Sequence, residues 1–362
     1  MSKLEKFFKH EDHSVNPEEL KQFLSLIVDI SNNHHRTHNF FDKIKQILQF
    51  YSKLIKDSLS NFEIFDVFKT NKMILLYIIQ NQIIMIDDNI YNEINGMIET
   101  NGTQYCHFFY PEIKSFLSNE KMQNIEKEIL SDNPYFFDHF QENREKGENE
   151  SYISILIRQD LVEEFISYIT RTNIPLSSEI KASVFETNSF LIESKNISLI
   201  EYSAFYGSIQ IFQFLINKSI ELTPSLWLFA IHSRNAELIH ILERNIKFPI
   251  NRWEKVYMEA IKCHHNEFAE YFINMYQIDP KMNDEIISYY TEYHNYSFFP
   301  SDFNESNEFF YLCYNNYTEL VNLFMEKKDK EIKESIIEEN KQAIQKAAEE
   351  DKTEILYYLL SK

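Results

Sequence analysis

The sequence predicts an all-α fold in which helical hairpins follow one another as a solenoid. The main observation is a motif that recurs five times in the C-terminal half of the 362-residue chain. In each copy a small or apolar residue is followed seven positions later by a polar residue, and apolar pairs come after it. Such internal repetition is typical of stacked helical arrays. A content of only 4 Gly and 8 Pro also favours helices over strands and turns. The five pairs are Ser203/Gln210, Ala230/Glu237, Ala260/Glu267, Leu312/Glu319 and Ala347/Glu354.

The spacing inside each copy predicts two antiparallel helices joined by a tight turn. The small first residue lets the helices approach closely, and the apolar residues after the polar position give the second helix one buried stripe. The chain must reverse within about three residues, which requires a left-handed backbone position. Glycine takes this conformation without strain, and Asn, Asp and His are the next most tolerant residues, so arginine fits least well. The predicted turn residues are Gly207, Arg234, His264, Asn316 and Asp351.

The first residues of the copies are 27, 30, 52 and 35 positions apart. The interval of 52 is too long for one repeat, so we expect an extra helix over 284–293 and then a loop over 295–307, rich in Ser, Pro and Asn. Another helix pair is expected over 152–168, with its turn near Asp160. The repeat region is therefore predicted to span 151–362, with repeats near 198–222, 224–248, 253–278, 307–327 and 340–361.

Residues 1–150 are predicted to form an N-terminal helical region. After a polar start, a helix begins at Pro17 with Asn16 as its cap, and a second amphipathic helix spans 40–56. Residues 61–81 look like a helix pair, and one interpretation is a degenerate repeat.

The part of this region beyond residue 81 shows weaker patterns. Short helices are expected over 113–117 and 122–130. The stretch 141–150 is charged and lacks apolar residues, so we expect a linker there. We place a domain boundary near residue 150.

The composition limits the classes of partner. A net charge of −20 argues against nucleic acid and against anionic membrane surfaces, whereas a basic or neutral protein remains compatible. Cys106, Cys263 and Cys313 are too few and too scattered for a disulfide framework. The N-terminus lacks the apolar stretch of a secretory signal, and the strongest apolar run, 73–79, is far shorter than a membrane span. We therefore expect a cytoplasmic protein.

The repeat region resembles a known family. Residues 200–215 (IEYSAFYGSIQIFQFL) are similar to the two-helix core of an ankyrin repeat, and 347–360 (AAEEDKTEILYYLL) resemble it more closely. Residues 222–232 and 259–267 look like the divergent helical module of unknown function found beside ankyrin repeats in expanded protozoan families. The resemblance implies an ankyrin-like solenoid. Pro224 stands six residues before Ala230 rather than four, and glycine is scarce, so we expect shortened or missing hairpin fingers.

The sequence contains few motifs that indicate a catalytic, cofactor-binding or metal-binding site. It has no glycine-rich nucleotide loop and no GxSxG elbow, so no catalytic or cofactor-binding residue is assigned. In the cluster His34, His35 and His38, the first and last stand four positions apart, which on a helix would point both imidazoles one way. His34 is followed by His35 and not by the Glu of an HExxH site, and we expect a polar loop.

Other chemically suggestive residues have simpler interpretations. Cys263 is expected to be buried in a hairpin with His264 in its turn, and Cys106 beside His107 carries no further signal. Trp227 and Trp253 near helix starts are interpreted as packing residues rather than partner contacts. We therefore assign no metal ligands.

The leading hypothesis is a non-catalytic protein-interaction scaffold. Its surface would be the concave face formed by first helices and connecting loops, and its unknown partner would be neutral or basic. The alternative is a metal-binding or hydrolytic enzyme that uses His34, His35 and His38. Stoichiometric zinc that disappears when His34 and His38 are replaced would favour this alternative. A purely structural oligomer is a third possibility.

Overall fold

The structure is a computed structural model. It describes residues 17–33, 40–97, 104–132, 136–248 and 253–277, and then 286, 289–290, 292–298, 312–313, 321, 325 and 345. Across these residues the chain is helical and forms no β-strand, with one isolated antiparallel bridge between Glu179 and Ser198. The predicted all-α class is therefore confirmed. Contacts divide the chain into two compact units, 1–247 and 248–362, which are described separately.

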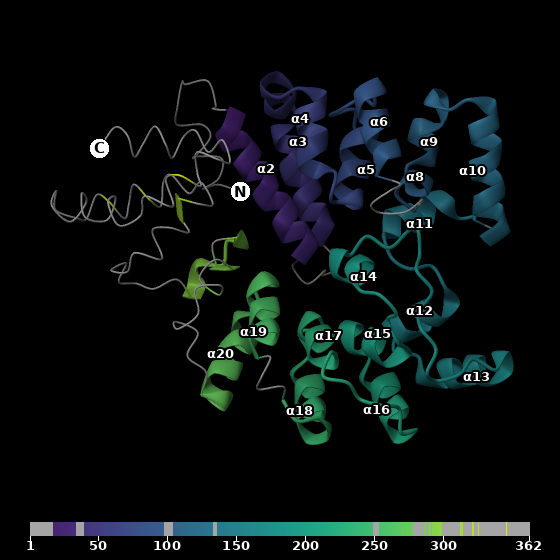
Figure 1. The fold of residues 1–362 in the computed structure, drawn as a ribbon, viewed down its shortest axis with the longest axis vertical. Helices are drawn as coiled ribbons and strands as arrows, with labels where there is room; N and C mark the ends of the chain where they lie inside the picture. The colour runs from purple at the N-terminus through teal and green to yellow at the C-terminus, as the bar shows by residue number, and fades with distance from the viewer. Residues whose placement is uncertain are drawn as a thin grey trace. The chain divides into compact units, whose positions relative to one another are not determined.

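The first compact unit begins with the predicted N-terminal helices (Figure 1). The helix expected at Pro17, the helix over 40–56 and the helix pair over 61–81 are confirmed. In that pair the connecting residue Lys69 is right-handed, so its turn differs from the predicted repeat turn. Ser60 starts the pair with a capping box to Glu63, which satisfies two free backbone amides. The helices are α2 (Pro17–Asn33), α3 (Phe40–Ser58), α4 (Asn61–Phe68), α5 (Lys72–Gln80) and α6 (Asp88–Gly96).

The linker predicted over 141–150 is wrong in its first half, which is helical. Arg144 lies on that helix and is fully buried, with its guanidinium bound to Glu112 at 2.6 and 3.0 Å and flanked by Phe108 and Phe140. A buried ion pair thus replaces the missing apolar residues. The helix expected over 122–130 is confirmed, whereas 113–117 forms mainly a 3-10 turn. The elements are α8 (Gln104–Phe108), α9 (Tyr110–Ile113), η1 (Lys114–Phe116), α10 (Asn119–Asp132) and α11 (Phe140–Lys146).

The rest of the first compact unit consists of helical hairpins (Figure 1). The first helix of each hairpin contacts the first helix of the next, because α12 packs on α15 and α15 packs on α17. The second helices α13 and α16 also touch. The hairpins are α12 (Tyr152–Arg158) with α13 (Val162–Thr172), α15 (Leu199–Tyr206) with α16 (Ile209–Asn217), and α17 (Leu226–His232) with α18 (Ala236–Asn245).

The loop between α13 and α15 links the hairpins to the N-terminal helices. It contains α14 (Ser189–Glu193), which contacts α2. Phe185 from this loop is fully buried in the same apolar cluster as the N-terminal helices and stacks on Phe136. The predicted boundary near residue 150 therefore falls inside a compact unit, where contacts cross it.

The hairpin turns have the predicted left-handed backbone. Gly207, Arg234 and His264 have φ values of 69°, 51° and 55°, and Asp160 has 52°. The turn after Ser203 closes with a Schellman hydrogen bond, in which the backbone amide of Ser208, five residues later, donates to the Ser203 carbonyl at 2.9 Å. The corresponding bond to the Ala260 carbonyl has the same length. Asn316 and Asp351 lie outside the described residues.

The second compact unit contains α19 (Trp253–Lys262) and α20 (Asn266–Tyr276), which form a hairpin. The extra helix expected over 284–293 is helical at residues 286, 289, 290 and 292, and the turn that follows has φ 53° at His294. The backbone amide of Asn295 then donates to the carbonyl of Tyr290, five residues earlier, at 2.9 Å, as in the other turns. The predicted loop over 295–307 thus starts with a buried repeat turn, followed by η4 (Tyr296–Phe298). His264 to His294 is the same 30-residue step as Arg234 to His264.

Changing Arg234 to glycine should stabilise the protein by about 0.5–1 kcal/mol. A non-glycine residue at positive φ costs about 1–2 kcal/mol, and the extra flexibility of glycine in the unfolded chain cancels part of the gain. Chemical denaturation of the full chain measures the effect. Arg244→Gly, an exposed position within α18, is the matched control and should lower stability. Equal losses in both variants would contradict the strained turn.

Candidate functional site

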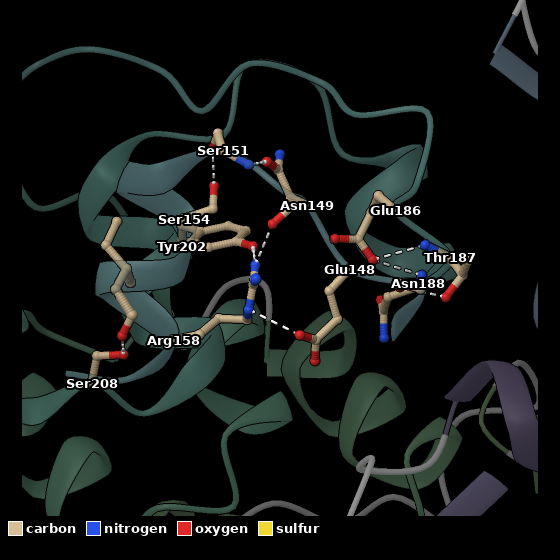
Figure 2. Close-up of polar contacts among 12 residues, drawn as sticks. Glu148, Asn149, Ser151, Ser154, Arg158, Glu186, Thr187, Asn188, Tyr202 and Ser208 are labelled. Carbon is tan, nitrogen blue, oxygen red and sulfur yellow. Dashed lines mark hydrogen bonds and ion pairs between the residues drawn. The ribbon is translucent and has the colours of Figure 1, made fainter. Parts of the chain in front are cut away.

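A polar network lies where the segment after α11 meets the first two hairpins (Figure 2). At its centre is Arg158, the last residue of α12, whose side chain is only 12% exposed. Its guanidinium donates to the Asn149 carbonyl at 2.8 Å and to the Tyr202 hydroxyl at 3.0 Å, and it pairs with Glu148 at 3.0 Å. Tyr202 lies on α15, so the Arg158 guanidinium links the first helices of two hairpins, α12 and α15, to the segment that follows α11.

Glu186 forms the second half of the network, on the loop before α14 (Figure 2). One of its carboxylate oxygens accepts the backbone amides of Thr187 and Asn188 at 2.9 and 2.8 Å. The Thr187 hydroxyl donates to the Gly147 carbonyl at 2.7 Å, which ties the loop to the end of α11. Glu186 is 6% exposed, so its carboxylate acts in a region of low dielectric.

The pKa values of two phenols in the network lie above the usual tyrosine value. Burial raises the pKa of Tyr202 to about 12, and the Glu186 carboxylate adds to that rise. Burial and the same carboxylate also raise the pKa of Tyr206 well above its usual value. An ordinary tyrosine is already neutral near pH 7, and the raised pKa values keep both phenols protonated at higher pH as well, so neither supplies phenolate as a base or nucleophile.

A cleft of about 530 Å³ opens beside the network. Its walls come from two stretches of the loop between α13 and α15, residues 180–183 and 191–197. Asn149, Glu186 and Tyr202 line it as well. These three residues are at least nine-tenths buried, and Asn149 and Tyr202 also accept hydrogen bonds from Arg158.

The histidine cluster of the alternative hypothesis, His34, His35 and His38, lies outside the described residues. Cys263 is buried as expected, and burial raises its pKa well above the usual value, which leaves little nucleophilic thiolate. His264 occupies the turn as expected, 2.7 Å from the Tyr293 carbonyl, and burial lowers its pKa.

The remaining candidates have structural surroundings. Cys106 is buried with its pKa raised to about 11, and its thiol lies 3.2 Å from the Ile94 carbonyl. Trp227 is fully buried, which confirms the packing interpretation. Trp253 is partly exposed and contacts Tyr257 edge to face within the second compact unit.

Sequence reasoning did not single out Arg158, Glu186 or Tyr202. The available signal was weak: Arg158 closes an otherwise apolar helix, YISILIR, where a charge must find a partner. Glu186 and Tyr202 are separated from it by 28 and 44 positions, so only the fold brings them together.

Comparisons with models of known protein families, with curated proteins and with solved structures gave no match for this chain. The ankyrin resemblance therefore rests on the quoted residues and stays a prediction. Within the described residues, none of the helices combines the length and the apolar character needed to cross a bilayer.

Proposed function

We propose that this protein is a non-catalytic protein-interaction scaffold whose hairpins form an ankyrin-like solenoid. The observation that carries the proposal is the order of helix contacts in the first compact unit, where α12, α15 and α17 pack successively. A short hairpin cannot bury its apolar stripe alone, and a neighbouring hairpin completes its core. Arrays of this kind present extended surfaces built from successive first helices and loops, and such surfaces commonly bind other proteins.

The loops before the first helices are the proposed contact surface. They carry exposed carboxylates at Glu179, Glu193 and Glu221. Together with the net charge of −20, these groups favour a basic or neutral partner over nucleic acid or an anionic membrane. We place the interaction in the cytoplasm. Because a fold alone does not determine function, the surface itself must be tested.

The test is proximity labelling in the native cell with two matched triple variants of the full chain. In one variant Glu179, Glu193 and Glu221 become glutamine, which removes three loop charges. In the other, the exposed carboxylates on second helices become glutamine: Glu163, Glu164 and Glu237. We expect the loop variant to lose labelling of a defined set of basic proteins, whereas the second-helix variant retains it.

Equal unfolding temperatures of the two variants would show that a difference in labelling comes from the changed surface and not from a loss of folding. If both variants keep all labelled proteins, or if both lose the same ones, the loop surface is not the binding site. A substrate turnover that depends on the histidines of the alternative hypothesis would overturn the non-catalytic assignment.

A further inference from the structure

The short helix α14 places an aromatic side chain on the first helices of two hairpins. The ring of Phe190 stacks on Phe205 of α15, with centroids 5.9 Å apart and ring planes at 13°. It also meets Phe229 of α17 edge to face at 5.0 Å, and the centroid of the His232 ring lies 4.1 Å away. These last three residues are at least nine-tenths buried, whereas Phe190 is half-buried. Phe190 therefore covers an aromatic site formed by α15 and α17.

The helix that carries Phe190 is itself held by few buried contacts. Leu191 is the one buried residue among the five of α14, and Ile192 is 46% exposed. α14 also contacts α2, where the Ser189 hydroxyl lies 3.2 Å from the Asn32 carbonyl, which is longer than usual for a hydroxyl donor. A segment with few buried apolar contacts opens at a lower free energy than the core around it.

The chain is anchored on both sides of α14, so an opening of this helix would involve only a short segment. On the N-terminal side, the Thr187 hydroxyl donates to the Gly147 carbonyl at 2.7 Å. On the C-terminal side, the Ile180 amide donates to the Ile197 carbonyl at 2.7 Å. Asn196, between α14 and this second anchor, has a left-handed backbone with φ 57°, which asparagine tolerates.

We propose that α14 is a removable cover and that a protein partner displaces Phe190 with an aromatic side chain of its own. The inference rests on the proposed scaffold function and deepens it, because the covered site lies on the first helices that the scaffold would present. Phe190 indicates what the site accepts, since stacked and edge-to-face aromatic pairs gain more than the burial of their area alone. While Phe190 stays in place, it competes with the partner and weakens the partner's apparent affinity.

The first test uses the unaltered full chain and an isolated probe, so it does not depend on finding the partner. Amide hydrogen exchange is followed by NMR while N-acetyl-phenylalanine methylamide is added. The reporters are the amides of Ile192 and Ser194, which make hydrogen bonds of 3.0 Å within α14. The reference is the Tyr202 amide, which makes a hydrogen bond of the same length at the start of α15.

A probe that binds the open form of α14 must increase the population of that form. Exchange at the two reporters should therefore rise roughly tenfold when the probe concentration is ten times its dissociation constant for the open form. Exchange at Tyr202 should stay constant. The leucine analogue of the probe is apolar without an aromatic ring, and it should leave exchange at α14 unchanged.

Phe190→Ala removes the internal competitor and supplies the dissociation constant of the probe for the uncovered site. Because an open form is a minor population, the phenylalanine probe should bind this variant about tenfold or more tightly than it binds the unaltered chain. Ile192→Ala changes an exposed residue of the same helix, so it is the matched control and should leave probe binding unchanged. If Phe190→Ala fails to fold, the exchange experiment on the unaltered chain decides the question.

Exchange at α14 that ignores the phenylalanine probe, equal acceleration by the leucine analogue, or equal probe affinity in Phe190→Ala and the unaltered chain would each overturn the proposal. None of these results depends on the loop-variant labelling experiment, so the scaffold function can survive them. Conversely, a probe that opens α14 in a chain whose labelling ignores the loop charges would retain the covered site and reject the scaffold.

Discussion

Replacing Glu112 with alanine should lower the unfolding free energy of the first compact unit by about 3–5 kcal/mol, since removing one partner of a buried ion pair leaves an uncompensated charge. The remaining charge would be Arg144, whose side chain is fully buried. Its contacts with the faces of Phe108 and Phe140 cannot replace the carboxylate, because a cation over an aromatic ring contributes only about 0.5–2 kcal/mol. Urea denaturation of the full chain, followed by circular dichroism, measures the change.

Two further variants separate the buried charge from general damage. Adding Arg144→Met to Glu112→Ala removes the charge and keeps an apolar side chain of similar length, so most of the lost stability should return. Glu142→Ala removes an exposed partner of Lys146 on the same helix and should have little effect. A double variant no more stable than Glu112→Ala alone would refute the ion-pair explanation.

Changing Gly147 to alanine should lower stability by about 2–5 kcal/mol. Gly147 ends α11 with φ 66°, where an L-residue costs about 1–2 kcal/mol. A β-carbon there would also lie 2.5 Å from the Met73 sulfur and 2.8 Å from the Thr187 hydroxyl, and such overpacking typically costs about 1–3 kcal/mol. The clash would disturb the Thr187 hydrogen bond that ties the loop to α11. The same denaturation experiment measures the loss.

Gly96→Ala provides the contrast, because a β-carbon there would have no atom within 4 Å and the residue is helical. Alanine is the better helix former, so this change should be neutral or stabilising. If Gly147→Ala proved as harmless as Gly96→Ala, the close packing between α11, α5 and the loop would be wrong.

The hairpins could be predicted because their information is local. Helical spacing of apolar residues and a turn-compatible residue lie within one short stretch, and Gly207 and His264 adopt the expected left-handed backbone. Even Arg234, the least suitable residue, adopts it, since packing of the two helices outweighs the preference of one residue. The turn at His294 escaped detection because the apolar pattern after it is incomplete: Ser301 and Asp302 stand where the motif has its second apolar pair. The pair His294-Asn295 resembles Arg234-Asn235, and this likeness was the sequence signal for a turn here.

The polar interior could not be predicted because its partners are distant in sequence. A charged stretch such as 141–150 looks like a linker unless the position of Glu112 is known, and local periodicity carries no such information. The same holds for the cleft, whose lining runs from Gln104 to Tyr202. Charge composition predicts that an acidic chain exposes carboxylates, but only the fold distinguishes the buried Glu186 from the exposed Glu193.

The loop that contacts the N-terminal helices has a consequence for how the chain matures. Lys72 donates to the Val184 carbonyl at 2.9 Å, and the Ser189 hydroxyl lies 3.2 Å from the Asn32 carbonyl, so residues more than a hundred positions apart must meet. Because domains generally fold in the order of translation, the N-terminal helices leave the ribosome first and offer a surface on which the later loop can order. The leading helices would then act as a template for the first hairpins, and a nascent chain lacking them would expose Phe185 to aggregation.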